Sequence, residues 1–204
     1  GTAVLNGDGT VTFTPAANIT GPVDITYTIS DGHGGTATST ARVNVLAVND
    51  TPLALNDAAD TTEDTAVSRS ALTGVLSNDS DVDSPILTLS GARSGTSGAF
   101  TSPGTTGVTL TAIYGSLLIH ADGSYTYTPG NAAQALNTGD TVQDVFSYQV
   151  SDGSLSANAT LSITVNGASD AAIISGTASG LVKEDVTAQL TATFGDRILK
   201  SEQL

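Results

Sequence analysis

Along most of the chain, apolar residues alternate with threonine, serine and other polar residues at a period of two. Such alternation is typical of strands that bury one face, because successive side chains of a strand point to opposite sides. Asp-Gly pairs at 8–9, 31–32, 122–123 and 152–153 favour tight turns between these segments. The pattern predicts an all-β fold of antiparallel β-sandwiches, with no helix before residue 181. The residues expected on buried faces include Val11, Phe13, Ile25, Tyr27, Ile29, Val43, Val45, Tyr125, Tyr127, Phe146, Tyr148, Val150, Leu161, Ile163 and Val165.

Four motifs recur in the same order at nearly one separation. Residues 6–15 match 120–129 at an offset of 114, and 27–32 match 148–153 at an offset of 121. Residues 42–45 match 162–165 at an offset of 120, and Glu63-Asp64 recurs as Glu184-Asp185 at an offset of 121. The chain therefore contains a structural repeat of about 120 residues.

The repeat length divides the sequence into three parts. We expect residues 1–50 to be the C-terminal part of one repeat, 51–168 a complete repeat, and 169–204 the start of a third. The tail from residue 194 loses the alternation and gains basic residues. A partial sandwich cannot bury its inner face, so the end pieces should be less stable than the centre. Because the chain has no methionine, we expect it to be part of a longer one.

The charge balance narrows the choice of partners. Twenty acidic residues face six basic ones, for a formal net charge of −14. Nucleic acid and anionic lipid both require a positive surface, so we expect neither nucleic-acid binding nor membrane insertion. No apolar run is long enough to span a bilayer, and no signal-like segment is visible. With no cysteine there are no disulfides, and a metal is the remaining candidate for holding acidic loops together.

Acidic residues cluster where the repeats should meet. If seven strands run alternately up and down, one pole of the complete repeat collects Asp50, Glu63, Asp79, Asp81, Asp83 and Asp152. The opposite pole collects Asp140, Asp144 and Asp170, followed by Glu184 and Asp185. Calcium takes six to eight oxygen ligands with loose geometry, so these residues are the predicted calcium ligands. The alternative is a set of solvated acidic turns, since aspartate favours turns in any case.

One acidic stretch also has the alternate spacing of an EF-hand loop. Asp79, Asp81 and Asp83 fit its first three ligand positions. Ser84 replaces the required glycine and Ser90 the bidentate glutamate, and no flanking helices are predicted. We therefore exclude an EF-hand.

Three stretches resemble a known family. Residues 122–129, 136–153 and 161–167 resemble the VCBS repeat of large bacterial adhesins, and residues 6–45 are similar to the second half of the bacterial cadherin-like repeat. Residues 49–52 resemble the Asn-Asp-x-Pro boundary between such units. The resemblance implies Ig-like or cadherin-like sandwiches in tandem, exported by type I secretion to the cell surface, often beside the glycine-rich calcium repeats of RTX proteins. Ser84-Pro85 departs from it, since a Gly-Asp pair is usual there.

These observations support a structural function over catalysis. His33 is predicted in a turn and His120 at a strand end, with no evident Ser–His–acid group. The leading hypothesis is a non-enzymatic stalk of a secreted adhesin in cell adhesion or biofilm formation, with calcium at its repeat junctions. Its partners would be neighbouring repeats and host or biofilm glycans or proteins.

Two alternatives remain open at this point. One is a carbohydrate- or protein-binding module, for which Phe100 and Tyr114 would have to be exposed on one face. The other is an accessory domain of a secreted toxin or hydrolase.

Overall fold

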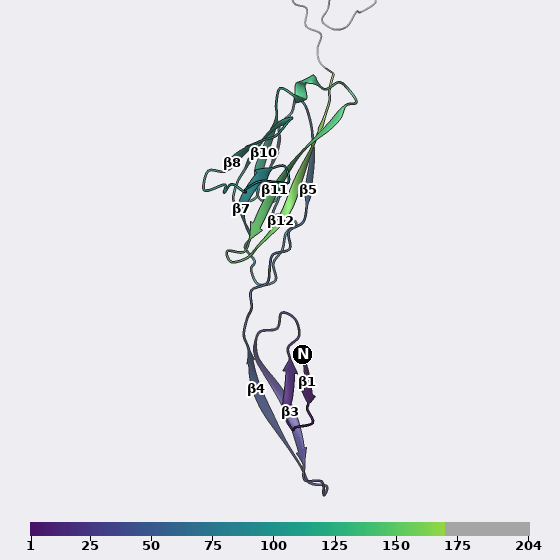
Figure 1. The fold of residues 1–204 in the computed structure, drawn as a ribbon, viewed down its shortest axis with the longest axis vertical. Helices are drawn as coiled ribbons and strands as arrows, with labels where there is room; N and C mark the ends of the chain where they lie inside the picture. The colour runs from purple at the N-terminus through teal and green to yellow at the C-terminus, as the bar shows by residue number, and fades with distance from the viewer. Residues whose placement is uncertain (170–204) are drawn as a thin grey trace, which may run out of the picture.

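The computed structural model describes residues 1–169, which are all-β apart from one 3-10 turn at Ala133–Ala135. Two units follow one another along the chain (Figure 1). The first unit consists of two antiparallel hairpins, one of β1 (Thr2–Leu5) with β2 (Val11–Thr14), the other of β3 (Gly21–Ser30) with β4 (Thr36–Val45). The predictions that concern residues 170–204, including the third repeat, lie outside the described residues.

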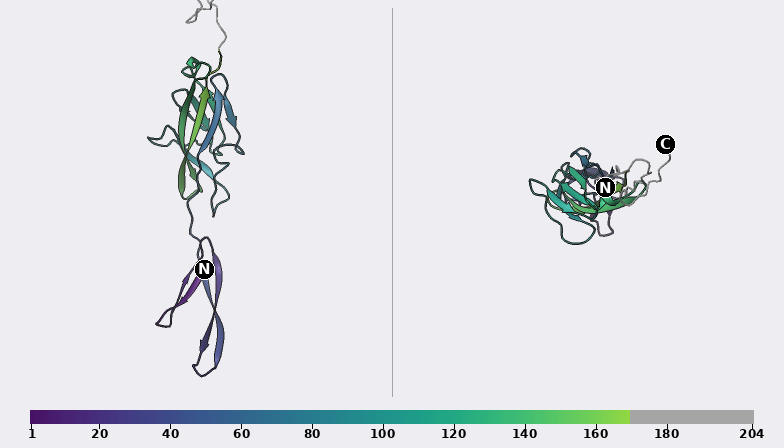
Figure 2. Two further views of the ribbon diagram at one scale, coloured as in Figure 1. Left: turned by 90° about the vertical axis from the view of Figure 1, so that its right-hand side faces the viewer. Right: turned by 90° about the horizontal axis from the view of Figure 1, so that it is seen from above.

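The second unit is a sandwich of two four-stranded sheets (Figures 1 and 2). One sheet has the order β5-β12-β11-β7, comprising Asp57–Thr62, Ser156–Asn166, Thr141–Ser151 and Thr88–Ser94. The other has the order β6-β10-β9-β8, comprising Val67–Arg69, Tyr125–Pro129, Gly115–Ile119 and Val108–Thr111. The predicted β-sandwich is confirmed.

The first segment of the sandwich belongs to both sheets. β5 runs parallel to β12, and after a short turn β6 pairs antiparallel with β10 in the other sheet. The expectation of seven strands, all antiparallel, is therefore wrong. The second unit forms eight strands because its first segment divides at Glu63–Ala66, and β5 and β12 run in one direction between the poles.

The core lies between the two sheets. Tyr125, Tyr127, Phe146 and Tyr148 are buried there with the aliphatic residues of β9, β11 and β12. The rings of Tyr127 and Phe146 meet edge to face, with centroids 6.2 Å apart, a favoured arrangement for aromatic pairs. The aromatic alternation of this unit thus builds the core, as predicted.

The same alternation does not give burial in the first unit. Tyr27 and Ile29 are 45% and 62% exposed, whereas their repeat equivalents Tyr148 and Val150 are 1% and 0% exposed. The prediction that these positions are buried is wrong for residues 1–46. The two hairpins of the first unit form strands with an apolar face. Among the described residues, however, no further strands lie beside β3 and β4 to cover that face.

Close backbone contact joins the β6–β7 loop to the β9–β10 hairpin. Val75 N–H donates to the Gly123 carbonyl, and a Cβ on Gly74 would lie 2.1 Å from that oxygen. We expect Gly74→Ala to destabilise the sandwich by about 1–3 kcal/mol, because backbone atoms would have to move. Gly7→Ala, which meets nothing within 4 Å, is the control in urea unfolding followed by tyrosine fluorescence. Equal unfolding midpoints for the two variants would contradict the prediction.

Candidate cation sites at the poles of the sandwich

The linker between the units is attached to two loops of the sandwich. Asp50 N–H donates to Asp83 Oδ2 at 2.6 Å, and Asn49 Nδ2 donates to Asp152 Oδ2 at 2.6 Å. The hydrogen bond from Asn49 is the foremost cause of a lowered pKa at Asp152. The structure therefore brings Asp50, Asp83 and Asp152 together at the N-terminal pole, as the sequence predicted.

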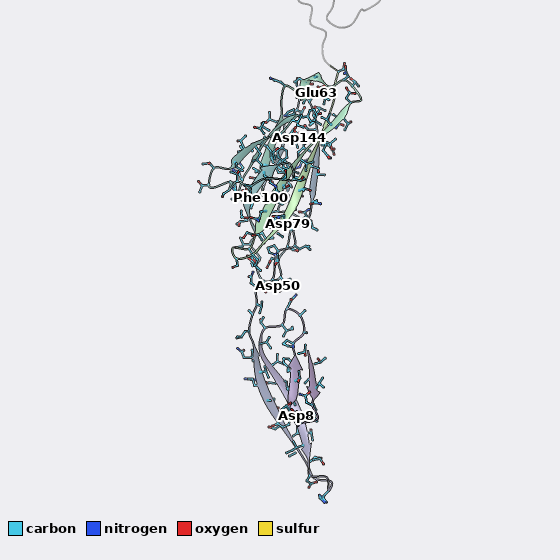
Figure 3. The ribbon with its side chains drawn as sticks, viewed as in Figure 1. Asp8, Asp50, Glu63, Asp79, Phe100 and Asp144 are labelled. Atoms are coloured by element: carbon cyan, nitrogen blue, oxygen red, sulfur yellow. The ribbon has the colours of Figure 1, made fainter. Side chains whose placement is uncertain are left out.

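Two further carboxylates of the β6–β7 loop, those of Asp79 and Asp81, each accept hydrogen bonds through only one of their two oxygens. Asp79 Oδ1 accepts from Leu55 N–H at 2.8 Å, and Asp81 Oδ1 accepts from the N–H groups of Asp83 and Ser84. The Oδ2 atom of each is buried and has no hydrogen-bond partner. A buried carboxylate oxygen without a partner is costly unless a cation or a donor meets it. Asp79 lies at the lower end of the sandwich in Figure 3.

Asp57 is not among the calcium ligands predicted from the sequence. The Tyr148 hydroxyl donates to Asp57 Oδ2 at 2.5 Å. Burial, aided by the negative charge of Asp79, raises the pKa of Asp57 to about 6. Burial also raises the pKa of Asp79. The signal available in the sequence was the position of Asp57, two residues before Ala59 and so on the same, inward face of a strand.

Glu63 lies at the other pole, so its assignment to the N-terminal pole is wrong. β5 crosses the sandwich from one pole to the other, and Glu63 directly follows its last residue (Figure 3). The side chain is 1% exposed. Its Oε1 accepts from Ala168 N–H at 2.6 Å, while Oε2 is buried without a partner.

Asp140 lies at this C-terminal pole, as predicted. Its Oδ2 accepts from Asn137 N–H at 2.7 Å, and its carbonyl accepts from Gly167 N–H at 2.9 Å. The hydrogen bonds from Asn137 lower the pKa of Asp140. The other residues assigned to this pole, Asp170, Glu184 and Asp185, lie outside the described residues.

Asp144 lies in the core and not at a pole, so its predicted position at the C-terminal pole is wrong. It is buried within β11. Its two oxygens accept from the N–H groups of Ile113 and Tyr114 and from the Tyr127 hydroxyl, the last at 2.8 Å. With both oxygens engaged by protein donors, this carboxylate fastens the β8–β9 turn to β11.

The donor set at both poles fits a hard divalent cation. Carboxylates and backbone carbonyls are the oxygen ligands that calcium takes, and each pole has a buried carboxylate oxygen without a partner. Within residues 1–169, no three acidic or histidine side chains are close enough to enclose an ion as they stand. Binding would therefore draw the loops of a pole together.

The aromatic surface required by the binding alternative is not present at Phe100 and Tyr114. Both side chains are half-buried. The Arg93 guanidinium covers the Phe100 ring at 4.2 Å from its centroid and donates to the carbonyls of Thr96 and Gly98. Tyr114 packs against the core. The loop is fastened over β7 and leaves no flat aromatic platform at these two residues.

The β-sandwich fold and its acidic poles place this chain in the class of cadherin-like β-sandwich modules. The chain belongs to the bacterial cadherin-like domain family, which matches residues 49–167, and a cadherin-like domain also matches residues 1–46. Domains of this class are adhesion-type extracellular modules that typically bind calcium and are generally not enzymes. No helix within residues 1–169 is long and apolar enough to cross a membrane.

More distant similarities come from solved structures. An endo-fucoidan hydrolase of glycoside hydrolase family 107 is 15% identical with a TM-score of 0.32, covering 81% of this chain and 22% of its own. Mouse clustered PcdhgC3 EC1-3 is 18% identical with a TM-score of 0.39, covering 82% of this chain and 51% of its own. This chain therefore spans about a fifth to a half of those proteins. No curated protein matches the sequence.

Proposed function

We propose that this chain is a structural extender of a secreted bacterial adhesin of the VCBS and RTX type, with calcium stiffening the junctions between its repeats. Placed between the cell and a host or biofilm surface, such repeats set the reach of the adhesive part. The observation that carries the proposal is the presence, at both poles, of buried carboxylate oxygens with no hydrogen-bond partner, on Asp79 and Asp81 at one and Glu63 at the other.

The charge of the chain supports the same conclusion. A net charge of −14 makes the acidic loops repel one another, and repulsion at a junction favours open, flexible arrangements. A bound divalent cation neutralises the carboxylates and holds the linker at Asn49–Asp50 against the loops containing Asp83 and Asp152. Extracellular calcium modules bind at ~10⁻⁴ to 10⁻³ M, so the repeats would be flexible during export and stiff outside the cell.

Calcium should stabilise the sandwich measurably. At a free concentration about 100-fold above Kd, binding to the folded state alone adds about 2.7 kcal/mol to the free energy of unfolding. Thermal unfolding with calcium and with chelator measures this difference. Asp79→Asn/Asp81→Asn keeps the hydrogen-bond acceptors and removes two charges, so we expect most of the calcium response to disappear. Asp60→Asn, at an exposed position of β5, is the matched control.

Small-angle scattering tests the mechanical part of the proposal. With calcium, the maximum dimension of the chain should increase, and the range of dimensions that the chain samples should narrow, because the linker no longer samples bent arrangements. An unchanged profile together with an unchanged melting temperature on adding calcium would reject the proposed function.

A further inference from the structure

A groove lies along one side of the sandwich, where the first segment of the complete repeat passes from one sheet to the other. β5 and β6 are edge strands of different sheets, and among the described residues neither has a second strand beside it. Because the two strands belong to different sheets, no backbone ladder closes the space between them. The groove that remains has a volume of about 490 Å³, which is within the usual range of small-ligand sites, about 300–1,000 Å³.

Polar side chains line most of the groove, and hydrogen bonds hold several of them in place. Thr62 Oγ1 donates to Thr65 Oγ1 at 3.0 Å, and Ser68 Oγ lies 2.8 Å from a threonine hydroxyl of β10. At the end of β12, Asn166 Nδ2 donates to the Thr61 carbonyl at 3.2 Å. These groups are thus positioned before a ligand arrives, which reduces the conformational entropy lost on binding.

Two opposite charges line this groove without pairing to each other. Asp60 is an exposed residue of β5, and Arg69 is an exposed residue of β6. Arg69 Nη1 donates to the Ser68 carbonyl at 3.1 Å, which leaves further guanidinium N–H groups for a ligand. The one ion pair within residues 1–169 joins Asp24 to Arg42, so the Asp60 carboxylate also remains available.

This combination of groups fits a neutral ligand with several hydroxyl groups. A carboxylate accepts hydrogen bonds from hydroxyls and a guanidinium donates to them, and bonds to charged groups are stronger than bonds between neutral ones. The net charge of −14 repels an anion, and Arg69 repels a cation within the groove. An extended peptide fits less well, because β6 has only three residues and β5 carries the charged Asp60, and both features oppose strand addition.

We propose that the groove between β5 and β6 binds a short neutral stretch of a glycan, with Asp60 accepting hydrogen bonds from sugar hydroxyls and Arg69 donating to them. This activity goes beyond the extender function, because the stalk would itself hold glycans along its side. No aromatic side chain lines the groove, so we expect a dissociation constant on the order of 1 mM for a free sugar. Where the repeat recurs in tandem, multivalency raises the effective affinity.

Saturation-transfer NMR on the full 204-residue chain tests the proposal, with glucose, galactose, mannose, N-acetylglucosamine, maltose, cellobiose and lactose as probes. We expect binding of at least one sugar, and Asp60→Asn and Arg69→Gln should each weaken it about tenfold or more, the effect of losing a hydrogen bond to a charged group. Both residues are exposed, so neither substitution should change the melting temperature. Asp24→Asn and Arg42→Gln remove the same charges from the first unit and should leave sugar binding unchanged.

Binding of none of these sugars overturns the proposal. So does binding that survives both groove substitutions, because the sugar would then occupy another surface. Binding of glycine but of no sugar would assign the groove to a zwitterion and would overturn the proposal as well. None of the predicted calcium ligands lines the groove, so the sugars should bind equally in calcium and in chelator. Failure here is therefore distinct from failure of the proposed function, which the calcium response decides.

Discussion

Asp144→Ala is expected to destabilise the complete repeat by about 3–5 kcal/mol, because it leaves several buried donors without an acceptor. The two N–H groups of the β8–β9 turn, at Ile113 and Tyr114, and the Tyr127 hydroxyl all donate to this carboxylate. Burial, followed by the bond to Asp144, raises the pKa of Tyr127, so its hydroxyl remains a donor at any ordinary pH. Urea unfolding followed by tyrosine fluorescence measures the loss.

The same substitution separates a structural carboxylate from a calcium ligand. Asp144→Ala should lower stability equally with calcium and with chelator, and so should the milder Asp144→Asn, which keeps one acceptor. Asp60→Ala, at an exposed position, should change stability by no more than about 0.5 kcal/mol. If instead Asp144→Ala lowers the free energy of unfolding only when calcium is present, Asp144 is a calcium ligand and the structural role given to it here is wrong.

The strands themselves could be predicted from local pattern. Phe146, Tyr148 and Val150 alternate with polar residues, and all three are buried on one face of β11. The Asp152-Gly153 turn joins β11 to β12 as expected, with Asp152 Oδ1 accepting from the N–H groups of the turn. Period and turn chemistry are properties of neighbouring residues, so a single sequence contains them.

The position of a side chain at one pole or the other could not be predicted in the same way. Glu63 follows β5 and lies one strand length from Asp57, and only the direction and extent of β5 assign it to the C-terminal pole. Asp144 is one residue in a strand whose inward face is set by its pairing with β12 and β7. Alternation gives a face but neither the partner strand nor the depth of burial.

The exposed Tyr27 shows a second limit of local pattern. Its alternation is the same as that of Tyr148, yet the hydroxyl of Tyr148 meets Leu55, Asp57 and Val75, all more than 70 residues earlier in the chain. Burial therefore depends on strands supplied from elsewhere in the repeat. A period of two predicts which side would be buried, and the presence of the opposing strands decides whether it is.

The last prediction concerns the pH dependence of the metal-free repeat. The pKa of Asp57 is raised from 3.8 to about 6 by burial and by the charge of Asp79. Between these two values the folded state holds the proton more tightly than the unfolded state, so the free energy of unfolding falls as the pH rises through that window. Because Asp57 is only half-buried, solvent screening reduces the effect to about 1–1.5 kcal/mol.

In chelator, the repeat should therefore unfold at a higher temperature near pH ~5 than near pH ~7.5. The raised pKa of Asp79 also makes the free energy of unfolding fall as the pH rises. The lowered pKa values of Asp140 and Asp152 affect stability only below about pH 4, so they do not change the difference between these two pH values. Asp57→Asn retains the acceptor for the Tyr148 hydroxyl and removes the charge. We expect it to raise the melting temperature at the higher pH and to flatten the pH dependence, with Asp60→Asn as control. Destabilisation by Asp57→Asn at both pH values would mean that the repeat prefers the ionised carboxylate even without a metal, because its bond to Tyr148 outweighs the cost of burying the charge.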